Sequence, residues 1–300
     1  MSYRLGIDLG GTKIEIVALD SAGHERLRAR VDTPHGDYDA TLAAIAGLVD
    51  RADAELGERA ATVGIGMPGI ESPATGLVKN ANSTWLIGRR LSADLERLVR
   101  RPLRLANDAN CFATSEAADG AAAGARVVFG VILGTGVGGG IVVDGRPLIG
   151  ANAIAGEWGH NNLPWPEDDE RPGPACYCGR NGCIESFLSG PGLAAGFRRA
   201  GGDARTPEEI VVAAGRGDAA AAAALDRYEH RLGRALASVI NVLDPDVIVL
   251  GGGLSNIDRL YRNVPALWTP WVFSDRVVTK LVKNRHGDSS GVRGAAALWP

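Results

Sequence analysis

The sequence predicts an α/β protein made of two similarly built domains. Two stretches, 5–19 and 127–143, each combine an apolar strand, a glycine-rich turn and a second apolar strand. Segments with apolar residues at helical spacing alternate with further short strands, which is typical of α/β folds. We therefore expect an internal duplication, with domains at 1–122 and 123–287 and a C-terminal helix, 288–300, that completes the first domain.

Composition and charge favour a soluble enzyme. The 300 residues are 45% hydrophobic and 22% charged, with a formal net charge of −3, so the charge gives no reason to expect a nucleic-acid or membrane partner. The chain begins almost directly on its first predicted strand, which leaves no room for a signal peptide, and no apolar run reaches the length of a membrane span. A cytoplasmic location is expected.

The first glycine turn opens a strand, whereas the turn of a P-loop opens a helix. Gly10 and Gly11 would let the backbone approach a ligand closely and adopt dihedrals that a Cβ forbids. Their N–H groups, with the Thr12 hydroxyl and the Lys13 ammonium, would form an anion site. Asp8 fits beside phosphate if Mg²⁺ lies between them. From this stretch alone, an ordinary hairpin explains the pattern equally well.

The next segments suggest a sugar site and a possible base. A helix is expected over 38–56, a buried strand over 62–70 and a polar loop over 79–85, where Asn82 and Trp85 suit a sugar, although most such clusters are simply turns. Asn107 and Asp108 follow a short strand at 103–106 and precede a helix expected over 111–123. Helix capping is the commoner role there, and catalysis by Asp108 becomes the better explanation only if a phosphate loop faces it.

The second glycine turn, 134–140, holds five glycines in seven residues between dense apolar strands. Each glycine costs roughly 0.5–1 kcal/mol in conformational freedom, so a need for close backbone approach is a better explanation than a flexible linker. Two such turns facing each other across a cleft would clamp one triphosphate, as in the actin-like (ribonuclease H-like) ATPases. The predicted phosphate contacts here are Gly134, Thr135, Gly136 and Gly138.

A third glycine run, 251–253, follows a buried strand at 246–250. A strand end that leads into glycines and a helix is a usual ligand edge, and Gly252, Gly253 and Asn256 are expected at the adenosine, with Ser255 or Asn256 starting the helix. Further helices are expected over 213–225 and 228–243, and a closing helix over 291–299 should pack on the first domain.

Three clustered cysteines predict a structural zinc site. Cys176, Cys178 and Cys183 lie within eight residues, and three thiolates with His160 make a closed Zn²⁺ set. Cys111, by contrast, is expected to be a small buried hydrophobic residue. Glu157 and Glu185 adjoin the ligands, so the metal would bring two carboxylates together as a sugar-binding wall. Solvated surface acids are the open alternative.

Five segments together resemble the ROK family of sugar kinases and repressors: 8–13, 107–110, 134–140, 156–160 and 176–185. The stretches 79–86, 105–116 and 286–300 are most similar to the bacterial manno(fructo)kinase branch. The resemblance implies ATP- and Mg²⁺-dependent phosphorylation of a hexose at its 6-hydroxyl, preferably fructose, with mannose as the second candidate. It also implies a structural Zn²⁺ and a homodimer. It makes Asp108 the catalytic base, and the sugar contacts would be Asn107, Glu157, His160 and Glu185.

Three alternatives stay open. The same scaffold serves glucokinases and N-acetylglucosamine kinases, and a sugar panel separates these from a fructokinase. A sugar-sensing regulator without turnover is a different class of protein. The family's repressors carry an N-terminal helix-turn-helix for which the sequence shows no room. The predicted catalytic acid, Asp108, is present in this sequence, so we expect an enzyme.

Overall fold

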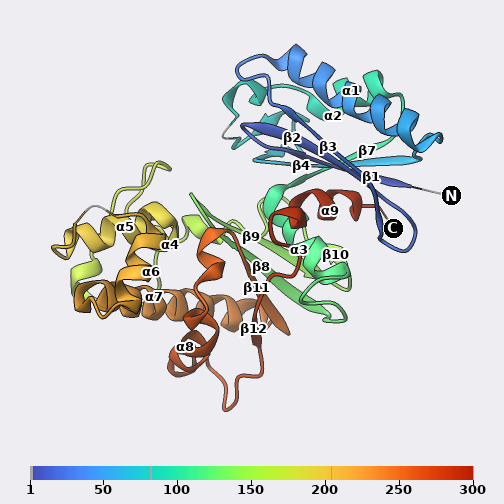
Figure 1. Ribbon diagram of the computed structural model, residues 1–300. Coiled ribbons are helices and arrows are strands. Elements are labelled where there is room, and N and C mark those ends of the chain that lie inside the picture. The colour runs from blue at the N-terminus through green and yellow to red at the C-terminus, as the bar shows by residue number, and fades with distance from the viewer. Residues whose placement is uncertain (1–2, 82, 204, 300) are drawn as a thin grey trace. The chain divides into compact units, whose positions relative to one another are not determined.

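A computed structural model describes residues 3–81, 83–203 and 205–299, and its contacts divide the chain into two compact units (Figure 1). Unit 1 comprises Met1–Ala123, Gly140–Ala155 and His286–Pro300, and unit 2 comprises Gly124–Gly139 and Gly156–Arg285. These limits lie near the expected ones, except that 140–155 belongs with unit 1. A reason is visible at Gly140, where a Cβ would overlap the backbone carbonyl of Ala109 at the start of a unit 1 helix.

Unit 1 is a five-stranded sheet covered by helices on both faces. The strand order is β3-β2-β1-β4-β7, with β1 antiparallel to β2 and parallel to β4, and β4 parallel to β7. Helices α1 and α2 cover one face, and α3 and α9 cover the other (Figure 1). The bounds are β1 Arg4–Leu9, β2 Lys13–Leu19, β3 Glu25–Asp32, β4 Thr62–Met67, β7 Leu103–Asn107, α1 Tyr38–Leu56, α2 Leu91–Val99, α3 Asp108–Ala118 and α9 Ser290–Ala296, with a small β5–β6 ribbon at Ile70–Glu71 and Val78–Lys79.

The closing helix α9 packs on unit 1, as expected. Gly6 of β1 and Gly64 of β4 lie directly beneath it, and a Cβ at either position would overlap the α9 backbone. Val292 and Ala296 join one buried apolar cluster on this face, and Leu298 joins another. The indole Nε1–H of Trp299 donates to the Val63 carbonyl at 2.9 Å. The C-terminal segment is therefore an integral layer of the N-terminal sheet.

Unit 2 repeats this plan. The second five-stranded sheet has the order β10-β9-β8-β11-β12, with β11 parallel to both β8 and β12. The unit boundary passes through β9, so β10 is counted with unit 1. The central strand is β1 in the first sheet and β8 in the second. Each central strand lies between the next strand of its hairpin (β2 or β9) and a later parallel strand (β4 or β11). This shared order agrees with the expected duplication. The bounds are β8 Val127–Leu133, β9 Val137–Val143, β10 Arg146–Pro147, β11 Val247–Gly251, β12 Lys280–Lys283, α4 Ile184–Leu188, α5 Gly190–Arg199, α6 Pro207–Gly215, α7 Ala219–Leu243 and α8 Arg259–Trp268.

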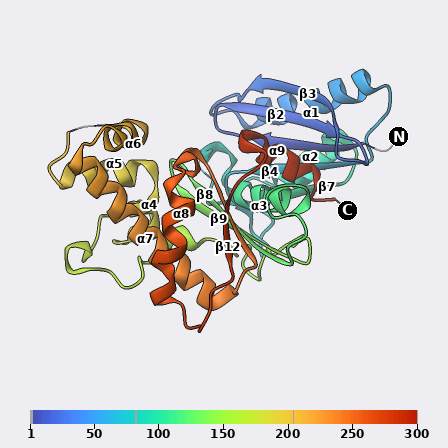
Figure 2. The ribbon, with the colours of Figure 1, turned by 60° about the horizontal axis from the view of Figure 1, so that its bottom comes forward.

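Several helix bounds differ from expectation for local reasons. The helix expected over 111–123 is α3, which begins at Asp108 because Asn107 caps it. Most of the two helices expected over 213–225 and 228–243 forms the single long α7, and residues 213–215 instead end α6. Helices α5 and α6 lie along α7 (Figure 2). The break between α6 and α7 covers residues 216–218, and the Asp218 side chain accepts from the N–H groups of Ala220 and Ala221 in the first turn of α7. Short 3₁₀ helices occur at Thr84–Leu86, Trp158–His160, Asp168–Glu170, Gly253–Asn256, Thr269–Trp271 and Gly287–Ser289.

Among the residues that the structure describes, no helix combines the length and the apolar character needed to cross a membrane.

Candidate active site

In unit 1, one edge of the sheet carries the predicted catalytic residues. Asp8 of β1 is aligned with Gly66 of β4, and Gly66 is aligned with Ala106 of β7. Neighbouring strands lie about 4.8 Å apart, so the Cα atoms of Asp8 and Ala106 are separated by roughly 10 Å. These strands run parallel, so the glycine turn after β1 and the Asn107–Asp108 pair after β7 lie at the same edge.

The first turn is tightly closed. The Gly10 N–H donates to the Lys13 carbonyl at 3.0 Å, and the Thr33 hydroxyl donates to the Gly10 carbonyl at 2.8 Å. Neither Gly10 nor Gly11 has a positive φ, so the expected need for unusual dihedrals was wrong. Glycine is needed at position 10 because a Cβ would lie 2.9 Å from the Lys13 carbonyl. Gly11, Thr12 and Lys13 are exposed, so they are accessible to an anion.

Asp8 lies in an environment that disfavours its charged form. Burial, with repulsion from Glu15, raises the pKa of the Asp8 carboxyl to about 6, although Lys13 opposes the shift. Gly291, in the first turn of α9, is so close that a Cβ there would lie 3.6 Å from the carboxyl group. A poorly hydrated carboxylate at the edge of a phosphate turn is a suitable partner for a divalent cation.

Asn107 and Asp108 lie together at the N-terminus of α3. The Asn107 side chain accepts a hydrogen bond from the Ala109 N–H at 2.9 Å and caps α3. Asp108 Oδ1 accepts from the same N–H at 2.8 Å, but the residue is exposed. Burial raises the pKa of Cys111, and both Asp8 and Asp108 add to the shift, so both carboxylates lie within electrostatic range of this thiol. Asp108 is thus an accessible carboxylate on the side of unit 1 that carries Asp8.

In unit 2, the second turn is shorter than expected. The Gly134 N–H donates to the Gly136 carbonyl at 3.0 Å, and β9 begins at Val137. Gly138 therefore belongs to a strand, which corrects its placement in the turn. Glycine is needed in this strand because a Cβ at Gly139 would lie 2.7 Å from the Gly156 carbonyl and 2.8 Å from the Trp158 ring. The strand glycines let 156–160 pack against β9.

The third glycine run lies beside the second turn. Gly252 has φ +79°, and a Cβ there would lie 2.5 Å from the Leu133 carbonyl at the end of β8. Gly253 and Asn256 bound a 3₁₀ helix, and Asn256 is exposed. The α-helix α8 begins only at Arg259, so the helix start expected at Ser255 or Asn256 was wrong. The two glycine runs of unit 2 nevertheless share one sheet edge, as ligand-binding turns of α/β folds do.

Three predicted sugar contacts, Glu157, His160 and Glu185, lie near the glycine turn that precedes β9. Glu185 Oε2 accepts from the Val137 N–H at 2.9 Å, so its carboxylate lies against the turn. The Tyr177 hydroxyl lies 2.9 Å from His160 Nε2. The Tyr177 side chain is exposed, but partial desolvation of the hydroxyl raises its pKa to about 12. Glu185 and Glu157 contribute to this shift, so both acids lie within electrostatic range of the phenol. Tyr177 was not predicted as a site residue. Its position between Cys176 and Cys178 was the one feature of the sequence that could have indicated this role.

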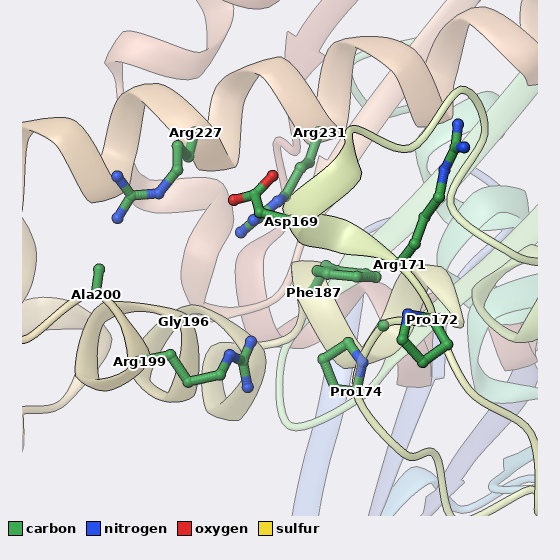
Figure 3. A pocket seen from close by; sticks show the side chains of 11 residues that line it. Asp169, Arg171, Pro172, Pro174, Phe187, Gly196, Arg199, Ala200, Arg227 and Arg231 are labelled. Atoms are coloured by element: carbon green, nitrogen blue, oxygen red, sulfur yellow. The ribbon is translucent and has the colours of Figure 1, made fainter.

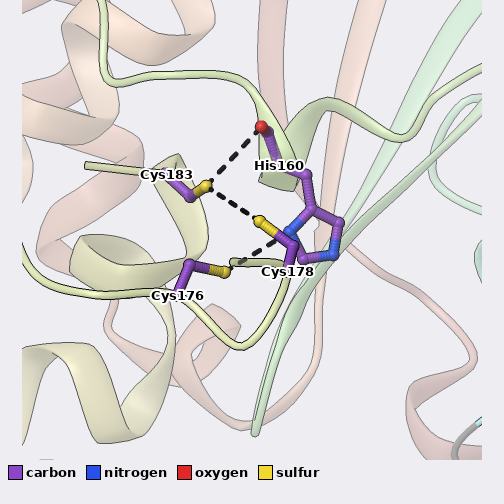
Figure 4. A group of neighbouring side chains, drawn as sticks. All are labelled: His160, Cys176, Cys178 and Cys183. Carbon is purple, nitrogen blue, oxygen red and sulfur yellow. Dashed lines mark hydrogen bonds between the residues drawn. The ribbon is translucent and has the colours of Figure 1, made fainter. Parts of the chain in front are cut away.

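All four predicted zinc ligands converge in unit 2 (Figure 4). One ligand atom from each of His160, Cys176, Cys178 and Cys183 lies within 4.8 Å of all the others. Cys176 Sγ is 3.6 Å from His160 Nδ1, and Cys178 Sγ is 3.6 Å from Cys183 Sγ. A tetrahedral Zn²⁺ with Zn–S bonds of about 2.3 Å places its sulfur ligands roughly 3.8 Å apart, so the geometry fits.

The ionisation of the thiols in this cluster also favours a bound cation. The Arg180 side chain lowers the pKa of Cys178 to about 6, whereas burial raises the pKa of Cys183 to about 12. Three thiolates at these distances repel one another unless a cation lies between them. A bound Zn²⁺ would therefore complete the cluster and deprotonate it fully.

One predicted sugar contact is not located. Asn82 lies outside the described residues. Its neighbour Ser83 is buried in unit 1, and the Ser83 hydroxyl has no hydrogen-bond partner within the described part of the chain. A Cβ at Gly11 would lie 3.9 Å from that hydroxyl, so the loop over 79–85 approaches the first glycine turn.

Comparison with known proteins identifies the family. The ROK family model matches residues 4–300. Two relatives, each named N-acetyl-D-glucosamine kinase, are 40% identical (Pectobacterium atrosepticum) and 42% identical (Photobacterium profundum) over 297 residues, covering 98% of this chain and 97% and 98% of theirs. The crystal structure of a ROK hexokinase from Thermus thermophilus is 30% identical with a TM-score of 0.88, covering 99% of this chain and 97% of that chain. The fold is therefore the actin-like α/β fold. The chain belongs to the ROK family.

Proposed function

We propose that this protein is a sugar kinase that transfers the γ-phosphate of ATP to the 6-hydroxyl of N-acetylglucosamine. The observation that carries the proposal is the full-length identity of 40% and 42% to relatives named as kinases of this sugar. The predicted preference for fructose is not supported by these relatives, whose names favour the alternative. Fructose, mannose and glucose become the competing substrates.

In the proposed reaction, unit 1 provides the base and holds the metal–phosphate group. The exposed Asp108 carboxylate accepts the proton of the sugar hydroxyl as its oxygen attacks the γ-phosphorus. Thr12, Lys13 and the N–H groups of the first turn bind phosphate oxygens. Asp8 would hold Mg²⁺, which when bound neutralises phosphate charge. Catalysis of this kind depends mainly on positioning and charge stabilisation.

Unit 2 provides the second phosphate turn and the acids that bind sugar hydroxyls. One carboxylate oxygen of Glu185 holds the Val137 N–H, which leaves the other oxygen to accept from the sugar. Glu157 and His160, with Asn107 from unit 1, supply the remaining polar contacts. Gly252, Gly253 and the exposed Asn256 are proposed at the adenosine. A homodimer, suggested by the family resemblance, stays a prediction.

The proposed Zn²⁺ has a structural role. His160 follows Glu157 in one segment, and Cys183 precedes Glu185 in another. A metal bound by both segments would fix the two acids relative to each other, and its four protein ligands leave no open position for substrate.

A coupled assay of ADP release with N-acetylglucosamine, N-acetylmannosamine, glucose, mannose and fructose tests the proposal. We expect the highest kcat/KM with N-acetylglucosamine, and none of this turnover without Mg²⁺. A tenfold preference for fructose would restore the original prediction. No turnover with any sugar, combined with measurable sugar binding, would favour a sensor.

A further inference from the structure

Unit 2 contains a cavity of about 490 Å³ between α5, α7 and the loop over 169–174 (Figure 3). The cavity lies outside the residues assigned to ATP, sugar or zinc. Its lining is rich in arginine and includes one acid, together with apolar rings: Arg171, Arg199, Arg227, Arg231, Asp169, Pro172, Pro174 and Phe187. Cavities of this size hold small molecules, and an excess of arginine over acid in the lining favours an anion.

Two of the four arginines have no partner within the described part of the chain. Arg171 donates to the Pro166 carbonyl at 2.8 Å and points away from the other three (Figure 3). Arg231 donates to Glu170 at 2.7 Å. Arg199 and Arg227 make no hydrogen bond or ion pair with described residues. Arg231 projects from α7 and Arg199 from α5 into the space between the two helices, and the Arg227 side chain extends from α7 toward the Ala200 side of the cavity (Figure 3).

The wall of the cavity is held in place. Glu170 is 5% exposed, and its carboxylate also accepts from Arg234 at 2.8 and 2.9 Å. The guanidinium of Arg231 lies 5.0 Å from the centre of the Phe187 ring, which is itself buried. Arg231 is therefore fixed by a buried acid and an aromatic face, so little side-chain entropy is lost when it binds a ligand.

The unpaired positive charge also affects Arg199. Burial lowers its pKa, and repulsion from Arg231 and Arg198 adds to the shift. An anion between these guanidinium groups would relieve the repulsion, and Arg forks match phosphate oxygens geometrically.

We propose that this cavity binds a sugar phosphate, with its phosphate group held by Arg199 and Arg231 and with Arg227 adding positive charge to the same lining. The sugar ring would pack on Pro172 and Pro174, which line the cavity. The Asp169 carboxylate would accept sugar hydroxyls, and it would repel a ligand that carries negative charge along its whole length. The site is independent of the proposed kinase reaction, since none of its residues takes part in that reaction.

Chemical protection tests the proposal directly. The full-length protein is treated with phenylglyoxal, which modifies arginine, in the presence of glucose 6-phosphate, inorganic phosphate or glucose, and each arginine is quantified by peptide mass spectrometry. We expect glucose 6-phosphate to slow modification of Arg199 and Arg227 at least fivefold. Arg198, which is exposed and is not in the cavity lining, is the internal control and should react at an unchanged rate.

Calorimetric titration of variants gives a second measurement. Arg199→Ala and Arg227→Ala should each weaken binding of glucose 6-phosphate at this site at least tenfold, and Arg198→Ala, with the same change in charge, less than twofold. Binding at the kinase site would persist in all three variants. Equal protection by inorganic phosphate would show a plain phosphate site and overturn the sugar phosphate. Absence of protection at 10 mM ligand, or equal losses in all three variants, would overturn the site altogether.

Discussion

At the scale of single residues, Asp108 is the critical test of the mechanism. Asp108→Asn keeps the shape of the side chain and an oxygen for the Ala109 N–H, but it removes the base. We expect kcat to fall at least a thousandfold, with the affinity for ATP changed less than threefold. Initial rates and an ATP titration measure the two effects.

The matched control is Asn107→Asp, which retains a capping oxygen for α3. It should leave the fold intact and impair sugar affinity more than ATP affinity. An Asp108→Asn protein with a tenth of the normal kcat would mean that Asp108 contributes only as a helix-end residue.

Asp8 provides a prediction about pH. Its folded-state pKa of about 6 lies above the ordinary value of 3.8, so ionisation destabilises the metal-free protein. The full cost, about 3 kcal/mol, applies above pH 6 and disappears as the pH falls toward 4. Protons compete with Mg²⁺ for the same carboxylate, so the apparent Mg²⁺ affinity should fall about tenfold from pH 7 to pH 5. Mg²⁺ titrations of the kinase rate at both pH values measure this.

Asp8→Asn should remove both effects. At pH 7.5, in buffer without Mg²⁺, the variant should unfold at a higher temperature than the natural protein and should be almost inactive. Chelators are left out of this measurement because they would also remove Zn²⁺. An Asp8→Asn protein of unchanged Mg²⁺ requirement would contradict the role of Asp8.

At the scale of elements, the docking of α9 depends on glycines of the sheet. A Cβ at Gly64 would overlap the carbonyl of Ala295, so Gly64→Ala must push α9 away from β4. Overpacking typically costs about 1–3 kcal/mol, and we expect at least that loss in the free energy of unfolding. Denaturant titration followed by circular dichroism measures it.

Gly47→Ala on α1 is the matched control. Nothing lies within 4 Å of a Cβ there, and alanine is favoured over glycine in a helix by up to about 1 kcal/mol. This variant should be neutral or more stable. Equal destabilisation by both substitutions would show that the close approach of α9 to Gly64 is unimportant.

The zinc-binding segments give a third prediction. We expect one Zn²⁺ per chain by elemental analysis, lost in Cys178→Ser and retained in Cys111→Ala, because Cys111 is buried in unit 1 away from the cluster. Activity, assayed with excess Mg²⁺, should fall with the zinc content because Glu157 and Glu185 lose their fixed spacing. A zinc-free Cys178→Ser protein with full activity would refute the structural role.

These elements also show what sequence alone could supply. Tyr38–Leu56 and Val127–Leu133 were predicted with correct bounds, since apolar spacing and burial agree there. Strand β3 was missed because charged residues interrupt its apolar pattern, and β9 was begun too late because its glycines look like a turn. Gly139 is required by packing against Gly156 and Trp158, and Gly140 by packing against Ala109, which are tertiary causes that no local pattern contains.

The site shows the same limit. Motif spacing was enough to predict His160 and the three cysteines as one cluster, because thiolates close in sequence with glycines between them have few other uses. Tyr177 and the arginine cavity escaped, since their significance depends on which helices come together. Asn107 was given a sugar contact, and the structure adds that it caps α3.

At the scale of the whole molecule, segments that are far apart in the sequence belong to the same unit. Both sheets follow one plan, yet unit 1 is assembled from three segments of the chain, the last being His286–Pro300. Val292 and Leu298 of this segment are buried, together with Ala295 and Ala296. Burial of a Val or Leu side chain is worth about 1.5–3 kcal/mol, so the segment contributes roughly 5 kcal/mol, comparable to the whole stability of a marginal domain.

A chain ending at Arg285 should therefore lose the fold of unit 1 while keeping much of unit 2, because unit 2 takes no residues from 286–300. Hydrogen exchange with mass spectrometry should show β1, β4 and β7 unprotected and α7 still protected, with zinc retained and ADP release abolished. Adding a synthetic 286–300 peptide should restore part of the protection in β1 and β4, because α9 packs on them. Uniform loss of protection in both units would instead mean that the two sheets fold as one cooperative body, and the unit boundary would then have no energetic meaning.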